Sequence, residues 1–270
     1  FKLSNIIGID HICISSNNIL EDSKIFEKFG YKIDFYEKKN PIKNEKREFL
    51  NNNFKTHDFA LLKLHNSVAI ELIDHNENNE NIDQIFSIIF NSKNGKSIDL
   101  KSQDILLNKL KNIFNNSILK LNMNSTCNFF ECSEKENKIN SIIIKTNDIE
   151  KSKNFWCKLF GFVELKSPKN KIENYQILEF TSPIKNWSMK FILIEEKLEK
   201  KMRYLDDKGF TCVSFLVTNI EDFLKKFDNF GLKTNSVPYE TIVNNKKMRL
   251  IFLRGLENEI IELIEFKKNE

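Results

Sequence analysis

The residues best suited to chemistry are four histidines and five cysteines, and their spacing limits what they can do together. The cysteines form no CxxC pair, and an odd number at irregular spacing favours neither a disulfide framework nor a structural zinc site. We therefore expect most of them to be small buried side chains in a reducing compartment. Cys212 could be a reactive thiol if His11 lay beside it. The residues concerned are His11, His57, His65 and His75, and Cys13, Cys127, Cys132, Cys157 and Cys212.

Bulk composition and missing motifs narrow the function further. The sequence has no Gly-rich phosphate loop and no GxSxG elbow. Its 42 Lys and Arg residues are interleaved with 38 Asp and Glu residues, so the net charge of +4 forms no basic stripe and no nucleic acid partner is expected. The sequence contains no run of about 18 apolar residues, so no membrane span is expected. We expect a cytoplasmic protein, or an organellar one if a leader preceded Phe1.

One sequence pattern recurs along the chain: a strand, a polar turn, an amphipathic helix, a glycine and further strands. The copy that begins at residue 139 is the clearest. It has a strand at 139–144, a turn at Asn147 and Asp148, a helix at 149–160 and a closing Gly161. The pattern predicts a βαβββ module, of which this is the third along the chain.

The other three copies agree with this module to different degrees. The second is eroded and short by one strand, and the apolar residues of 82–90 follow a helical spacing that predicts a helix between modules. The first copy has strands at 9–14, 31–36, 59–64 and 68–73 and a helix at 19–29 before Gly30; the second has strands at 97–100, 118–123 and 127–132 and a helix at 104–114; the third continues with strands at 162–165, 175–180 and 189–194; the fourth has strands at 212–217, 233–237, 247–253 and 260–264 and a helix at 220–230 before Gly231.

A single βαβββ module would expose the apolar face of its sheet, so modules must pair. The sequence therefore predicts an α+β protein in which four βαβββ modules form two cupped mixed-sheet units with helices on the outside. Along the chain the modules divide into a first domain at 6–134 and a second at 138–268, with the polar stretch 133–138 as linker.

Gly209-Phe210-Thr211-Cys212 enters the first strand of the fourth module, and Ile261-Glu262-Leu263 lies in its last strand. The first phrase is similar to the Gly-Phe-Gly-His phrase that enters a strand in glyoxalase I, the lactoylglutathione lyase of the vicinal-oxygen-chelate superfamily, and the second is similar to the closing strand of that family. In the first module, His11 starts a strand and Ile70-Glu71-Leu72 resembles the Leu-Glu-Leu strand of the family. The resemblance extends over nearly the whole chain and implies the same two-domain fold.

The resemblance also implies a metal site between paired modules. In the family a His or Gln on a first strand and a Glu on a last strand, from each of two modules, hold Zn²⁺ or Ni²⁺. If the first module pairs with the fourth, the matching residues are His11, Glu71, Cys212 and Glu262, with Glu262 as the residue that moves a proton of the substrate. The second and third modules then keep only Glu131, and no metal is expected there.

Sequential pairing of the modules would give a different metal site. The alternative donors are Ser97 and Glu131 with His11 and Glu71. The four histidines all precede residue 76, so the iron site of 4-hydroxyphenylpyruvate dioxygenase, a second family with this layout, cannot be built.

The residues that hold glutathione in the family are largely replaced. The matching positions read Ser15, Lys208 and Ser236, and His75 stands where the family has Asn, so the sequence does not favour glutathione as a ligand. We expect a divergent, metal-dependent lyase or isomerase, or a close relative without lactoylglutathione lyase activity, that acts on a small oxygenated metabolite. The alternative is a metal-free small-molecule-binding protein or pseudoenzyme that uses the same cupped sheet.

Overall fold

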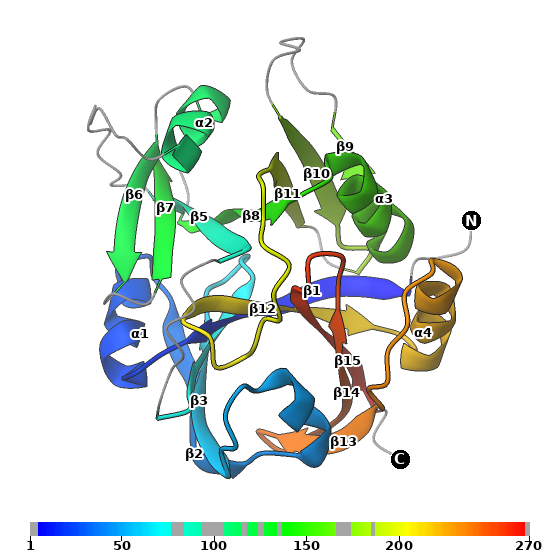
Figure 1. Ribbon diagram of the computed structural model, residues 1–270. Helices are drawn as coiled ribbons and strands as arrows, with labels where there is room; N and C mark the ends of the chain where they lie inside the picture. Colours follow the sequence, from blue (N-terminus) through cyan, green and yellow to red (C-terminus); the bar gives the residue numbers. More distant parts are fainter. Residues whose placement is uncertain are drawn as a thin grey trace.

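The computed structural model shows an α+β protein built on two mixed, curved sheets (Figure 1). It describes residues 5–76, 84–92, 105–114, 118–123, 127–133, 137–165, 174–184 and 187–267. An eight-stranded sheet has the order β13-β14-β15-β12-β1-β4-β3-β2, and a seven-stranded sheet has the order β6-β7-β5-β8-β11-β10-β9. We call the first the cup sheet and the second the upper sheet. Among the described residues, no helix has both the length and the apolar character needed to cross a membrane.

Apart from η1 and the start of the second module, the elements follow one another in the order that the repeat predicts. Their bounds are β1 Ile6–Ser15, α1 Ile19–Glu27, β2 Lys32–Pro41, the 3₁₀ helix η1 Asn44–Phe49, β3 Thr56–Lys63, β4 Ala69–Asp74, β5 Phe86–Ser92, α2 Ile105–Ile113, β6 Ile118–Met123, β7 Cys127–Ser133, β8 Lys138–Thr146, α3 Ile149–Phe160, β9 Val163–Glu164, β10 Tyr175–Thr181, β11 Ser188–Glu195, β12 Gly209–Val217, α4 Ile220–Asn229, β13 Tyr239–Val243, β14 Lys246–Arg254 and β15 Ile260–Phe266.

Polar turns start the helices as their sequences predict. The side chains of Asn18, Asp148 and Asn219 each accept a hydrogen bond from the backbone N–H three residues on, at 3.2, 2.9 and 2.8 Å. Such caps satisfy N–H groups that have no partner within the helix. At the end of α3, Gly161 has a φ of 75°, which a residue with a side chain rarely adopts.

The strand order decides how the modules pair. β1 runs antiparallel to β12, with His11 opposite Ser214 and Cys13 opposite Cys212, so the first and last parts of the chain share the cup sheet. The upper sheet joins β5 to β8 in the same way. Pairing of the first module with the fourth is therefore confirmed, and sequential pairing is wrong. The division of the chain near residue 134 stays a prediction about its sequence repeat.

Two predicted elements are wrong. Residues 86–92 form strand β5 and not an inter-module helix, because both faces of this strand are buried and its run of apolar residues satisfies either periodicity. The predicted strand at 233–237 is irregular chain, and the strand of this module is β13, which begins at Tyr239. The predicted strand at 97–100 lies outside the described residues.

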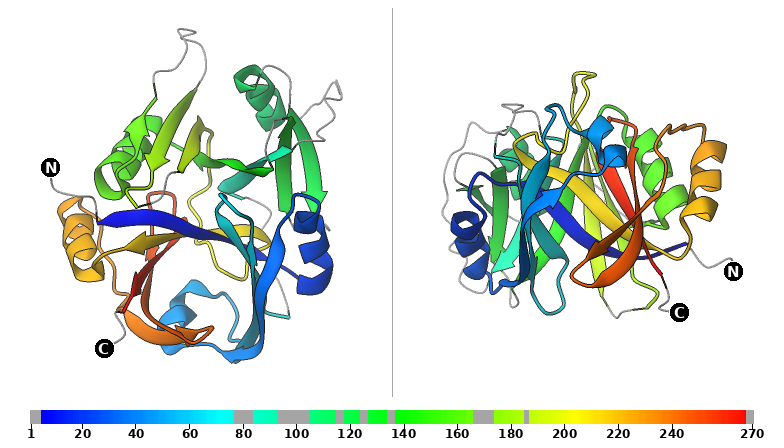
Figure 2. Two further views of the ribbon diagram at one scale, coloured as in Figure 1. Left: turned by 180° about the vertical axis from the view of Figure 1, so that it is seen from behind. Right: turned by 90° about the horizontal axis from the view of Figure 1, so that it is seen from below.

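Apolar packing holds the two sheets together. The largest cluster contains residues from both sheets and from α1, α3 and α4. Trp156 of α3, for example, contacts Phe191 of the upper sheet and Phe215 of the cup sheet, with ring centroids 5.0 and 6.1 Å apart. These helices cover one face of each sheet, and in Figure 2 the other face of the cup sheet curls around η1. The concave face of the cup sheet is therefore not covered by these helices and can hold a site.

The concave face of the upper sheet is closed by a helix. Leu107 and Leu110 of α2 are buried in a cluster with Ile89, Ile143 and Ile192, which lie on the face opposite the main core. α2 thus packs inside the upper sheet, whereas α1, α3 and α4 cover the outer faces. In the upper sheet, the concave face that corresponds to the cup is packed with these apolar side chains.

Candidate functional site

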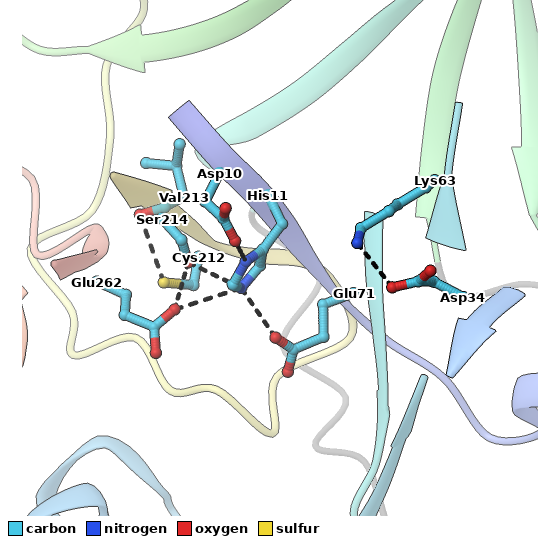
Figure 3. A network of polar contacts seen from close by, with 9 residues as sticks. All are labelled: Asp10, His11, Asp34, Lys63, Glu71, Cys212, Val213, Ser214 and Glu262. Carbon is cyan, nitrogen blue, oxygen red and sulfur yellow. Dashed lines mark hydrogen bonds and ion pairs between the residues drawn. The ribbon is translucent and has the colours of Figure 1, made fainter. Parts of the chain in front are cut away.

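The candidate site lies on the concave face of the cup sheet, where four central strands meet (Figure 3). Alternate residues of a strand share a face, so His11 and Cys13 of β1 point to the same side, as do Cys212 and Ser214 of β12. The pairing registers then place Glu262 of β15 beside Ser214, and Glu71 of β4 beside Cys13. Six side chains form two adjacent rows on the floor of the cup: Glu262, Ser214 and His11 in one, Cys212, Cys13 and Glu71 in the other.

His11 is the centre of this arrangement and is only 5% exposed. Its Nε2 atom lies 2.8 Å from Glu71 Oε2, 3.3 Å from Glu262 Oε2 and 2.9 Å from Ser214 Oγ. On the other side of the ring, Nδ1 lies 2.8 Å from Asp10 Oδ2. Ser214 also donates a hydrogen bond to Glu262. One imidazole nitrogen is therefore shared by two carboxylates that come from the two ends of the chain.

Two carboxylates at one nitrogen require a positive charge. Burial alone would lower the pKa of His11, but the charge of Glu71 and the hydrogen bond that the ring donates to Asp10 outweigh it, so this pKa is raised well above its ordinary value. For Glu71, burial alone would raise the pKa, but the charge of His11 and the hydrogen bond with His11 lower it overall. Without a metal, the cluster is an imidazolium held between carboxylates.

The thiols of Cys13 and Cys212 face each other in the second row. Both residues are buried, and their strands place them directly opposite one another. A hydrogen bond with Cys212 and burial raise the pKa of the Cys13 thiol, and burial raises that of Cys212. Cys212 Sγ lies 3.7 Å from the carbonyl oxygen of Val213. Both cysteines are therefore protonated and poor nucleophiles unless a cation replaces the protons.

Two of the other predicted ligands contact His11: Glu71 and Glu262 each lie against its Nε2 atom, whereas Cys212 lies in the neighbouring row. Among the described residues, a group of donor atoms within 4.8 Å of one another comprises His11, Cys13 and Glu262. Ser214 and Cys13 were missed by the sequence reasoning, although each lies two residues beyond a predicted ligand and so shares its face.

Predicted residues of the alternative site lie elsewhere. Glu131 is on β7 of the upper sheet, where it alternates with Phe130 and Cys132 of the apolar cluster around α2, so its side chain lies on the opposite face. Ser97 lies outside the described residues. Glu131 cannot join His11 and Glu71, because these are on the other sheet.

Three of the side chains that match glutathione-binding residues, those of Ser15, Ser236 and His75, are engaged or buried within the protein. Ser15 is fully buried and donates a hydrogen bond of 3.0 Å to the Leu205 carbonyl, and Ser236 donates one to Glu48. The Lys208 carbonyl accepts a bond of 3.2 Å from Gln84. His75 is fully buried against His57 and Phe54.

The cup encloses a cavity of about 160 Å³ above the polar floor. His11, Glu71 and Glu262 line its base, and Phe59, Phe252 and Tyr239 line its walls, together with Lys46 of η1. Burial raises the pKa of Tyr239 well above its ordinary value, so its hydroxyl stays protonated. The cavity combines apolar walls with a few converging polar groups, as ligand sites do.

The chemistry of the donors fits a divalent metal. Imidazole, carboxylate and thiolate all bind zinc. The Asp10 contact occupies Nδ1 of His11 and leaves Nε2 to face the carboxylates, which is the carboxylate–histidine arrangement found around zinc ligands. A cation at Nε2 would take the place of the ring's proton between Glu71 and Glu262.

No family model and no curated protein sequence matches the chain. Solved structures do, and they show that it has the vicinal-oxygen-chelate fold. It is similar to glyoxalase I of Zea mays, with 12% identity over 95% of this chain and 92% of that chain and a TM-score of 0.58. It is also similar to a putative dioxygenase of Bacillus subtilis, with 10% identity over 98% of this chain and 87% of that chain and a TM-score of 0.59. At these identities the similarity concerns the fold.

Proposed function

We propose that the chain is a metal-dependent lyase or isomerase of the glyoxalase I type, with a single metal site in the cup sheet, acting on a small oxygenated metabolite. The observation that supports this most is the meeting of Glu71 and Glu262 at Nε2 of His11, with Asp10 fixing the opposite side of the ring. The common fold with glyoxalase I of Zea mays is a second support.

His11, Glu262 and Cys13, whose donor atoms lie within 4.8 Å of one another, would hold the metal, and Glu71, which lies 2.8 Å from Nε2 of His11, offers a further donor. A bound divalent metal supplies Lewis-acid stabilisation of a negatively charged substrate oxygen. Glu262 lines the cavity and accepts a hydrogen bond from Ser214, so it is placed to take up a substrate proton and return it. The walls around Phe59 and Phe252 exclude water from the reacting atoms.

The metal site is tested by elemental analysis of protein purified without chelator. We expect about one zinc or nickel ion per chain, and replacement of His11 by Ala should remove it, because the variant lacks the nitrogen at which both carboxylates meet. His65→Ala is the matched control, since His65 is an exposed turn residue away from the site. Unchanged metal content in His11→Ala would take His11 out of the site.

We expect lactoylglutathione formation from methylglyoxal and glutathione to be weak or absent. Ser15 and Ser236 are already bonded within the protein and carry no charge to hold the carboxylates of the tripeptide. The measurement is the rate with zinc or nickel added, beside the Zea mays enzyme as positive control. Robust turnover would refute this expectation and would make glutathione a ligand.

A metal-free small-molecule-binding protein is the second candidate. The observation that favours it is the imidazolium of His11, which compensates Glu71 and Glu262 without any metal. The same elemental analysis separates the two functions. Wild-type protein that stays free of metal after incubation with zinc and nickel would support the binding protein and exclude the metal-dependent enzyme.

A further inference from the structure

Lys46 is a buried cation in the roof of the cup. It belongs to η1, which folds over the concave face between β2 and β3, and its side chain lines the cavity. Only 8% of the residue is exposed. Its Nζ atom lies 5.6 Å from the centre of the Phe252 ring, and the described residues give it no hydrogen bond or ion pair. A cation–π contact of this kind compensates an ammonium group only in part.

The charged and titratable groups that interact with Lys46 leave it without an ion pair. Burial, and then the charge of Lys46, lower the pKa of His57 to about 2 and that of His75 to about 3, so both rings are neutral and offer no counter-charge. The charge of Lys46 also lowers the pKa of Glu71, but the ion-pair partner of Glu71 is His11, at 2.8 Å. Since a buried charge without a partner is costly, the ammonium group calls for an anion in the cavity.

We propose that Lys46 binds the anionic oxygen group, a carboxylate or a phosphate, of a small ligand held in the cup. This inference rests on the proposed function, because a divalent metal would cancel the charges of Glu71 and Glu262 and leave Lys46 as a buried cation without a counter-charge. Lys43 and Lys246 also line the cavity and are exposed, so positive charge continues towards solvent. The small volume and the walls of Phe59 and Phe252 limit the ligand to a few heavy atoms.

The test measures binding of three probes by calorimetry: pyruvate, inorganic phosphate and hydroxyacetone. Pyruvate and hydroxyacetone share a carbon skeleton, but only pyruvate is an anion. Wild type, Lys46→Met, Lys46→Arg and Lys55→Met are compared, each metal-free and after loading with zinc. Met keeps the length of the Lys side chain without its charge. Lys55 is an exposed residue of the same connection and does not line the cavity, so Lys55→Met is the matched control.

We expect wild type and Lys55→Met to bind at least one anion more tightly than hydroxyacetone. Lys46→Met should lower the affinity for that anion about ten- to a hundredfold, because the variant lacks a charge-assisted hydrogen bond, and should leave the affinity for hydroxyacetone unchanged. Lys46→Arg should keep the preference for the anion. Whether pyruvate or phosphate binds identifies the ligand group as a carboxylate or a phosphate.

Two results would overturn the inference: equal affinity of the anion for wild type and Lys46→Met, or no preference of zinc-loaded wild type for either anion over hydroxyacetone. Zinc content, measured on the same samples, tests the proposed function separately. If wild type took up no zinc, a zinc enzyme would be excluded, while the difference between wild type and Lys46→Met in the metal-free samples would still decide the role of Lys46.

Discussion

The two buried histidines beside the cup show how burial and charge set the protonation of single residues. His57 and His75 lie side by side at one end of the paired strands β3 and β4, with ring centroids 5.6 Å apart, and His75 also packs on Phe54 at 5.4 Å. Neither nitrogen of His75 has a hydrogen-bond partner. Burial and the nearby Lys46 hold the pKa of His75 at about 3, so the ring packs as a neutral aromatic side chain against His57 and Phe54.

These rings predict a specific loss of stability in acid. The unfolded chain protonates His75 as pH falls below about 6.5, whereas the folded protein keeps it neutral down to about 3, so unfolding takes up a proton in that window. The free energy of unfolding should therefore fall by about 1.4 kcal/mol per pH unit for each such histidine between pH 6 and 5. Above pH 6.5 this contribution is fully present.

His75→Phe should remove the share of His75 in this slope, and urea unfolding of metal-free protein at pH 7, 6 and 5 measures it. The gap in stability between wild type and the variant should shift in favour of the variant as pH falls. His65→Phe serves as the control, because His65 is exposed. Identical slopes for wild type and His75→Phe would show that the folded protein protonates His75 over the same pH range as the unfolded chain.

The sequence could indicate some residues of the candidate site but not their partners. His11, Glu71 and Glu262 stood out because their phrases resemble a known family, and they meet in the structure. Ser214 and Cys13 complete the floor through the register between β1 and β12, and register is a property of two strands that no single stretch of sequence contains. The sequence did not indicate Lys46 as a site residue, because a lysine in a polar connection belongs to no motif or periodic pattern.

At the scale of elements, the junction of β1 and β12 carries the candidate site. Its ladder has register shifts near His11 and beyond Cys13, which local bulges produce. Opposite residues on the concave face bring His11 to Ser214 and Cys13 to Cys212, while Ile12 and Val213 point into the main core. One seam therefore supplies both the floor of the cup and the packing behind it.

Elements with a strong periodic pattern were predictable, and those shaped by long-range packing were not. α3 begins and ends at the predicted residues, since a polar cap and a glycine bound its amphipathic face. β5 was mistaken for a helix because burial on both faces removes the alternation that marks a strand. η1 has no cap from a side chain, and it is held by packing of Phe49 and Leu50 over the cup, which local sequence does not reveal.

At the scale of the molecule, the chain ends and the chain middle form separate sheets that share one core. Repeats in the sequence predict paired modules, because each module alone would expose its apolar face. They do not determine the partner, and the choice of the first with the fourth came from the family resemblance. In the structure the two sheets meet through aromatic residues, among them Trp156, Phe160 and Phe215.

This common core predicts that the two sheets unfold together. Phe215 lies on β12 of the cup sheet and is fully buried, with its ring 4.6 Å from Phe160 of α3 and 6.4 Å from Phe191 of the upper sheet. Phe215→Ala should lower the free energy of unfolding by about 3–5 kcal/mol, because it removes packing against both sheets and leaves a cavity between them.

Urea unfolding followed by tryptophan fluorescence and by far-ultraviolet circular dichroism measures this effect. Both tryptophans, Trp156 and Trp187, pack with the common core, whereas circular dichroism reports on the strands of both sheets. We expect coincident transitions that move together to lower urea in Phe215→Ala. Phe266→Ala, at a residue that is 46% exposed, should cause a much smaller shift. Two separate transitions, of which Phe215→Ala moved only one, would show that the sheets are independent units and that the core between them contributes little to the stability of the cup.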